Sequence, residues 1–321
     1  MRFEWLDITR GFLALSVALF HWYRNPGAAY LAVDYFFVLS GFVLCHTYAK
    51  QPSSGGSGWK KFTFRRLARL YPLHIFTFIV FLTYKEFQAP LTQVLSNLVL
   101  LQNVGFHTAP TLNAPSWSIS TEFIVALLAY PLLRDSRKNP LWLYSLIAIV
   151  SYGTIAYFFG HLDVHYRNVF KYVNSGLLRC LGGFVLGILS YRLFLKYKPQ
   201  LEKSKMKFLV LTLLLTLVVY RFYFYPFRHS RTDFVAPLVF SSLVVFLATL
   251  SFPVNSLTKA LMLFGKCAYA LYLSHYMLMY YVKRTFSDSV FVYVLCCLVF
   301  AWLLYVLIEE PVRNFALKRI A

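Results

Sequence analysis

Repeated long apolar segments constrain the fold of this chain more than any other feature. Hydrophobic residues make up 59% of its 321 residues, and they gather into segments long enough to cross the hydrocarbon core of a bilayer. A polypeptide crosses that core only as a helix or a closed barrel, and segments of this length favour helices. The sequence therefore predicts one all-α polytopic membrane domain over residues 1–321, without an appended soluble domain.

The apolar segments also predict the number of helices. We expect about ten transmembrane helices, near residues 6–23, 29–49, 72–88, 115–134, 141–160, 173–194, 208–224, 234–250, 260–282 and 289–308. Residues 91–103 are apolar but too short to cross easily, which predicts a short re-entrant or interfacial helix.

The basic residues predict the orientation of these helices. A formal charge of +20 raises the alternative of a nucleic-acid binder, but Lys and Arg concentrate in alternate loops, as the positive-inside rule requires. Segments 50–69, 134–138 and 192–207 and the C-terminal tail are basic, whereas 89–114 contains no Lys or Arg. We therefore expect these basic segments and both termini in the cytoplasm, and no nucleic-acid partner.

Three ionisable residues share one face of the first expected helix. Arg10 and His21 are eleven residues apart, and eleven steps of about 100° return almost to the starting direction about 16 Å further along. Asp7 precedes Arg10 by one helical turn and lies close to the same direction. Charged groups inside membrane helices are costly and usually face the bundle interior, so these three residues predict a functional polar stripe.

Two more groups of polar residues recur at helical spacing. Arg66 and Arg69 stand three apart at the cytoplasmic start of a helix, where two guanidinium groups can hold a phosphate or serve as topological anchors. Tyr269, Tyr272 and His275 recur every three residues, which suits either a functional face or a hydrogen-bonded packing seam.

Two acidic residues complete the set of candidates. Asp34 opens the second expected helix at the level of His21, and Glu122 lies one turn after Ser118 on the same helix face. Glu122 would serve either as a structural partner for a buried arginine or as a functional acid.

One loop segment has the spacing of metal ligands. His161, Asp163 and His165 alternate along the chain, but no further ligand stands nearby in the sequence. We interpret the segment as an ordinary loop and expect no metal site.

Together these residues resemble membrane-bound acyltransferase family 3, the multi-helix O-acyltransferases of bacterial surface polysaccharides. The segments that match the family's motifs are Arg10 to His21 (Arg-x10-His), Val33 to Gly41, Arg66-x-x-Arg69, Trp117-Ser118-x-x-x-Glu122, Tyr269 to His275 and Ile308 to Arg313. The resemblance covers nearly the whole chain. The departures are Ala32, Phe123 and Ala268, where the family more often has Gly, an acid and Ser.

The resemblance implies an enzyme of the bacterial inner membrane. Its donor would be acyl-CoA, with acetyl-CoA as the first expectation, and it would keep no permanently bound cofactor. The acceptor would be a hydroxyl of a polysaccharide or a lipid-linked sugar. Arg66 and Arg69 would bind the nucleotide phosphates, and Asp7 and Arg10 would line the donor channel.

The chemistry of acyl transfer assigns roles to the remaining residues. His21 is the expected general base, because an imidazole titrates near neutral pH. Asp34 or Glu122 would orient the His21 ring or bind the acceptor. Ser118, Tyr272 and His275 are second-tier candidates for contacts to the oxyanion or the acceptor. An acyl-histidine intermediate remains an alternative to direct transfer.

A proton-coupled exporter of sugars or lipid intermediates is the main competing interpretation. Ionisable residues inside helices also suit a proton relay, but such transporters typically have matched halves with broken helices. We find neither in this sequence.

Overall fold

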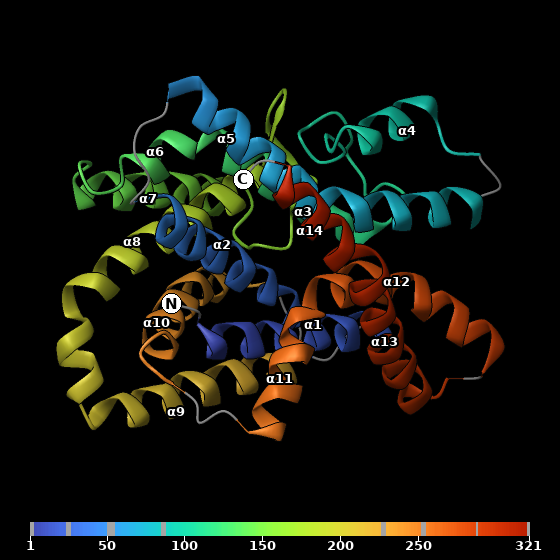
Figure 1. Cartoon of the computed structure of the whole chain (residues 1–321). Helices are drawn as coiled ribbons and strands as arrows, with labels where there is room; N and C mark the ends of the chain where they lie inside the picture. The colour runs from blue at the N-terminus through green and yellow to red at the C-terminus, as the bar shows by residue number, and fades with distance from the viewer. Residues whose placement is uncertain are drawn as a thin grey trace.

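The structure is a computed structural model that describes residues 3–23, 27–49, 55–84, 88–225, 229–251, 255–286 and 288–319. These residues form a helical bundle with one short antiparallel hairpin (Figure 1). The helices are α1 (Glu4–Tyr23), α2 (Ala32–Tyr48), α3 (Gly55–Tyr84), α4 (Leu91–Leu98), α5 (Trp117–Leu128), α6 (Tyr130–Arg134), α7 (Leu141–Phe158), α8 (Ser175–Lys203), α9 (Met206–Val219), α10 (Ala236–Leu247), α11 (Ser256–Lys266), α12 (Ala268–Thr285), α13 (Val290–Leu304) and α14 (Glu310–Lys318), and the hairpin is β1 (Asn168–Phe170) with β2 (Val173–Asn174).

Six helical segments of the described chain are long and apolar enough to cross a membrane. They are Ala29–Tyr48, Gly58–Tyr84, Leu141–Phe158, Ser175–Lys203, Met206–Phe224 and Val290–Lys318. The chain is thus a multi-pass membrane protein, but the expected count of about ten spans is not confirmed.

The remaining expected spans differ from these six in length or polarity. The expected span 115–134 divides at Ala129 into α5 and α6, and Pro131 stands in the first turn of α6. At a rise of about 1.5 Å per residue, the twelve residues of α5 or α10 reach only about 18 Å. Helix α1 has 20 residues and α12 has 18, which is long enough to cross a membrane. Both helices carry charged side chains, and these lower their mean hydropathy. The eight residues of α4 are too few to cross a bilayer.

Helices α2 and α8 pack against one another at the centre of the bundle. A Cβ atom added to Gly41 of α2 would overlap the carbonyl oxygen of Phe184, and one added to Gly187 of α8 would overlap that of Val38. Small residues let membrane helices approach at backbone distance, so these two glycines set how α2 lies on α8.

A second group of helices surrounds α1. Helix α1 packs against α11 and α12, as the blue and orange ribbons in Figure 1 show. Helix α12 packs in turn against α3 and α13. Helix α14 lies along α3. The first turns of α1 and α12 therefore meet the middle of α3 and the C-terminal half of α2 around one space.

Candidate active site

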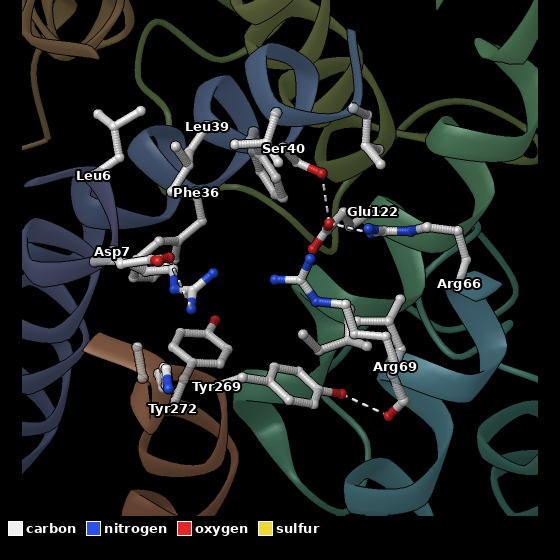
Figure 2. Close-up of a pocket in the computed structure, with 18 of the residues that line it drawn as sticks. Leu6, Asp7, Phe36, Leu39, Ser40, Arg66, Arg69, Glu122, Tyr269 and Tyr272 are labelled. Atoms are coloured by element: carbon white, nitrogen blue, oxygen red, sulfur yellow. Dashed lines mark hydrogen bonds and ion pairs between the residues drawn. The ribbon is translucent and has the colours of Figure 1, made fainter. Parts of the chain in front are cut away.

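A cavity of about 400 Å³ fills this space (Figure 2). Its walls come from α1, α2, α3, α5, the end of α11, α12 and the chain around the start of α14. Five Lys or Arg side chains face three acidic ones: Arg10, Arg66, Arg69, Lys266 and Arg313 against Asp7, Glu122 and Glu309. An excess of positive charge in a walled cavity concentrates anionic ligands such as phosphates.

Arg66 and Glu122 form an ion pair in the wall of the cavity. The guanidinium of Arg66 donates to Oε1 of Glu122, and the Ser40 hydroxyl donates to the same oxygen at 2.6 Å. The side chain of Arg66 is only 4% exposed and that of Glu122 is 16% exposed. Much of the charge of Arg66 is therefore already balanced by a carboxylate.

Arg69 lies one turn further along α3 and lines the same cavity. Figure 2 shows its guanidinium extended into the open space toward Glu122. It forms no hydrogen bond or ion pair of standard length with any residue that the structure describes. Of the two arginines, Arg69 is thus the one with donors available to a ligand.

Arg10 is held at the junction of α11 and α12. Its Nη2 donates to the carbonyl oxygen of Gly265 at 3.0 Å and lies 3.6 Å from Oδ1 of Asp7. Gly265 has no Cβ, which leaves room for the carbonyl oxygen of Asp7 directly against it. The expected pair of Asp7 and Arg10 therefore lies in the cavity wall.

Ser118 and Tyr272 lie together in the cavity wall on the side nearest His275. The Ser118 hydroxyl donates to the Tyr272 hydroxyl at 2.9 Å, and the Tyr272 hydroxyl donates to the carbonyl oxygen of Pro115 at 3.1 Å. The rings of Tyr272 and His275 have centroids 5.9 Å apart. One turn earlier on α12, Tyr269 ties the helix to α3 through a 2.6 Å hydrogen bond to the Leu70 carbonyl oxygen.

His21 and His275 meet directly behind Tyr272. Nε2 of His275 lies 3.1 Å from Nδ1 of His21, which also lies 3.0 Å from the carbonyl oxygen of Val17. His275 is fully buried, whereas His21 is partly exposed. Nε2 of His21 has no hydrogen-bond partner among the described residues. The two imidazoles can share a proton, and His21 keeps one nitrogen for a substrate.

Asp34 lies away from this cavity, within the contact between α2 and α8. Both of its oxygens accept from Arg179, Oδ1 at 3.0 Å and Oδ2 at 2.6 Å. The two side chains are 0% and 2% exposed. The structure thus brings Asp34 together with Arg179 rather than with His21.

The loop histidines pack on aromatic rings. His165 stacks on Trp117 with centroids 4.2 Å apart, and His161 stacks on His229 at the same distance. Burial lowers the pKa of His165 to about 3, so its contact with Asp163 is not an ion pair at neutral pH. Among the described residues, no three His, Cys, Asp or Glu side chains are arranged to hold a metal ion.

Three residues of these sites were not selected from the sequence. Ser40 binds Glu122, Arg179 binds Asp34, and Glu309 lines the cavity with Oε2 buried and unpaired among the described residues. Arg179 had a usable signal, because a lone arginine in an apolar helix requires a buried acid. Ser40 lies in the segment Val33 to Gly41 that resembles a family motif, but its contact with Glu122 depends on how two distant segments pack.

Comparisons with known proteins agree on one family. The family model described as "Acyltransferase domain" matches residues 3–309. "Protein 2 in picA locus" of Rhizobium radiobacter is 42% identical over 87 residues, which cover 26% of this chain and 46% of that protein. "Acyltransferase MdmB" of Streptomyces mycarofaciens is 37% identical over 125 residues, which cover 35% of this chain and 31% of that protein. The matched part is less than half the length of either relative. No solved structure matches the chain.

Proposed function

Because the chain belongs to membrane-bound acyltransferase family 3, we propose that it is an integral membrane O-acyltransferase. It transfers an acetyl group from cytoplasmic acetyl-CoA to a hydroxyl of an extracytoplasmic or lipid-linked saccharide. One observation carries the proposal: a cavity with an excess of positive charge ends at the Ser118–Tyr272 pair, next to the His21–His275 pair.

The donor occupies the cation-lined cavity. Its phosphates lie at Arg69, with Arg66 held beside them by Glu122. Lys266 and Arg313 add positive charge to the same cavity. The pantetheine arm then runs along α1 from Arg10 toward His21, which places the thioester at Ser118 and Tyr272.

The reaction proceeds by direct transfer in this proposal. His21 removes the proton from the acceptor hydroxyl, and the hydroxyl oxygen forms a bond to the thioester carbonyl carbon. When the donor binds, the Ser118 hydroxyl turns from Tyr272 and the Tyr272 hydroxyl turns from the Pro115 carbonyl oxygen, so that each donates its hydrogen to the oxyanion of the tetrahedral intermediate. The carbon–sulfur bond then breaks, and the CoA thiolate takes the proton that His21 carried.

The partners of His21 and Glu122 support them in different ways. His275 faces Nδ1 of His21 and holds the ring with Nε2 directed at the acceptor. Glu122 positions Arg66. The role of Asp34 is to stabilise the fold, because both of its carboxylate oxygens accept hydrogen bonds from Arg179.

The test is turnover of radiolabelled acetyl-CoA by the purified protein in nanodiscs. We expect release of free CoA, accelerated by added saccharide acceptor, with label transferred to that acceptor. Saccharide flux in proteoliposomes without any thioester turnover would instead support an exporter. Mass spectrometry of surface polysaccharide from a deletion strain then identifies the sugar that loses its acetyl group.

A further inference from the structure

The donor cavity does not extend to the imidazole of His21. Ser118 and Tyr272 line it, whereas His21 and His275 do not. A donor whose thioester lies at Ser118 and Tyr272 would occupy the part of the cavity nearest the two imidazoles. The acceptor hydroxyl must therefore reach His21 from another side.

A second cavity, of about 440 Å³, lies between the later halves of α3 and α12. Its lining includes Val80 and Tyr84 of α3, Leu278, Tyr280 and Arg284 of α12, and Phe300 of α13. This volume suits a small ligand or part of a larger one. Tyr272 at the first cavity and Tyr280 at the second are about 12 Å apart along α12, and His275 lies between them.

Aromatic rings connect this second cavity to the imidazole of His21. The Tyr276 ring meets His21 edge to face with centroids 5.3 Å apart, and it meets Tyr280 at 5.2 Å. The Tyr280 hydroxyl donates to that of Tyr276 at 3.2 Å, and the Tyr84 ring lies 6.2 Å from that of Tyr280. A ligand seated against Tyr280 is thus one aromatic ring away from His21.

The cavity opens to the outside of the bundle. Tyr84, Tyr280 and Tyr281 are 59%, 42% and 62% exposed. In a membrane protein, this exposure at the later end of α3 is directed at the bilayer and its interface, where tyrosine is favoured. A ligand can therefore enter from the lipid phase without crossing the protein.

The chemistry of the walls selects a ligand with three parts. Val80, Leu278 and Phe300 offer a hydrocarbon surface, and the tyrosine faces suit the apolar faces of sugar rings. Arg284 supplies the positive charge that complements a phosphate. We propose that this second cavity binds the acceptor as a lipid-linked sugar, a saccharide joined through a phosphate to a hydrocarbon chain. The inference rests on the proposed function and names its acceptor class.

A photoactivatable probe tests the site by binding. The probe is a hexose linked through phosphate to a polyprenyl chain that carries a benzophenone, added to the protein in nanodiscs. We expect adducts on α3 and α12 peptides that line the second cavity.

Two variants should reduce this labelling. Val80→Trp fills the cavity and should cut the labelling by about tenfold or more, and Arg284→Gln should cut it through loss of the phosphate contact. Leu213→Trp, on an exposed face of α9, is the matched control and should label as wild type.

Competition separates a lipid-linked acceptor from a free one. Unlabelled polyprenyl-phosphate hexose should suppress the adducts, and the methyl hexoside at the same concentration should not. Equal competition by the methyl hexoside would overturn the lipid-linked assignment.

Acetyl-CoA turnover, measured on the same nanodiscs, separates this inference from the proposed function. Labelling that is unaffected by Val80→Trp, in protein that turns over acetyl-CoA, overturns the acceptor site alone. Protein that neither binds nor turns over acetyl-CoA overturns the proposed function, and the acceptor assignment with it.

Discussion

At the scale of single residues, the two facing imidazoles differ in what they can reach. His275 is fully buried, whereas His21 is partly exposed and keeps Nε2 without a described partner. We expect His21→Ala to lower turnover at saturating acetyl-CoA by about a hundredfold to ten-thousandfold, as loss of a general base does. Binding of CoA should be unchanged, because the base acts in the transition state.

His275→Ala should cost less than His21→Ala, because His275 orients the base rather than acting on the substrate. His107→Ala is a control, since His107 binds Ser96 and does not line the cavity. Near-normal turnover of His21→Ala together with an inactive His275→Ala would mean that His275 of α12, and not His21, is the general base.

The two arginines of α3 should differ in their effect on donor affinity. Arg69→Ala removes a guanidinium without described partners, so we expect a loss of CoA affinity of about tenfold to a hundredfold, the size of a charge-assisted hydrogen bond. Arg66→Ala should also weaken CoA binding and additionally leave Glu122 unpaired. Equilibrium binding of CoA measures both losses.

Lys196→Ala, outside the cavity, controls for a general loss of positive charge. If both arginine variants bind CoA with wild-type affinity, Arg66 and Arg69 do not bind the donor and serve only as topological anchors.

The pair of Asp34 and Arg179 should affect stability rather than chemistry. Asp34→Ala leaves a buried guanidinium without its counter-ion, which typically costs about 3 to 5 kcal/mol. The double variant Asp34→Leu with Arg179→Met removes both charges and should recover much of that loss in a thermal unfolding assay. It should also recover turnover. A folded double variant without activity would mean that Asp34 or Arg179 takes part in the reaction or in acceptor binding.

At the scale of elements, the contact between α2 and α8 depends on glycine. A methyl group on Gly187 meets the backbone of α2, which cannot move without displacing the helix. We expect Gly187→Ala to destabilise the protein by about 1 to 3 kcal/mol, as overpacking does. The measurement is the fraction of soluble monodisperse protein after heating in detergent.

Gly153→Ala in α7 is the matched control, because a Cβ atom there meets nothing within 4 Å. It should be neutral or slightly stabilising, since alanine favours a helix over glycine. Equal stability of the two variants would mean that α2 and α8 are not held at backbone distance.

At the scale of the whole molecule, orientation decides which side supplies the donor. We predict that Lys60, at the start of α3, faces the cytoplasm and that Thr108 faces the opposite side. Both residues are exposed. An engineered cysteine at Thr108 should react with an impermeant thiol reagent applied to spheroplasts, and one at Lys60 should react only after lysis.

The native cysteines require one precaution in this experiment. Four of the five are buried and Cys296 is partly exposed, so a Cys296→Ala background keeps the signal clean. The reverse labelling pattern would show that the assigned orientation is wrong and that the donor cavity opens on the outer side.

The sequence by itself determined what local geometry controls. Long apolar segments require helices in a bilayer, and the helical repeat places Asp7 beside Arg10 and Ser118 near Glu122 without knowledge of any other segment. The same repeat placed Tyr272 one turn before His275. The family could be recognised because its motifs lie within single helices.

Only the tertiary structure decided which helices face one another. Asp34 binds Arg179, 145 residues away, and His21 meets His275 across 254 residues. Whether an acid pairs with an arginine or with a histidine depends on where two helices cross, and that crossing is set by close-packed positions such as Gly187. In the part of the chain that the structure describes, six helical segments are long and apolar enough to cross the membrane, because α5 and α10 are short and the charged residues of α1 and α12 lower their hydropathy. Packing against neighbours, which no single segment encodes, is the physical reason for each of the long-range pairs.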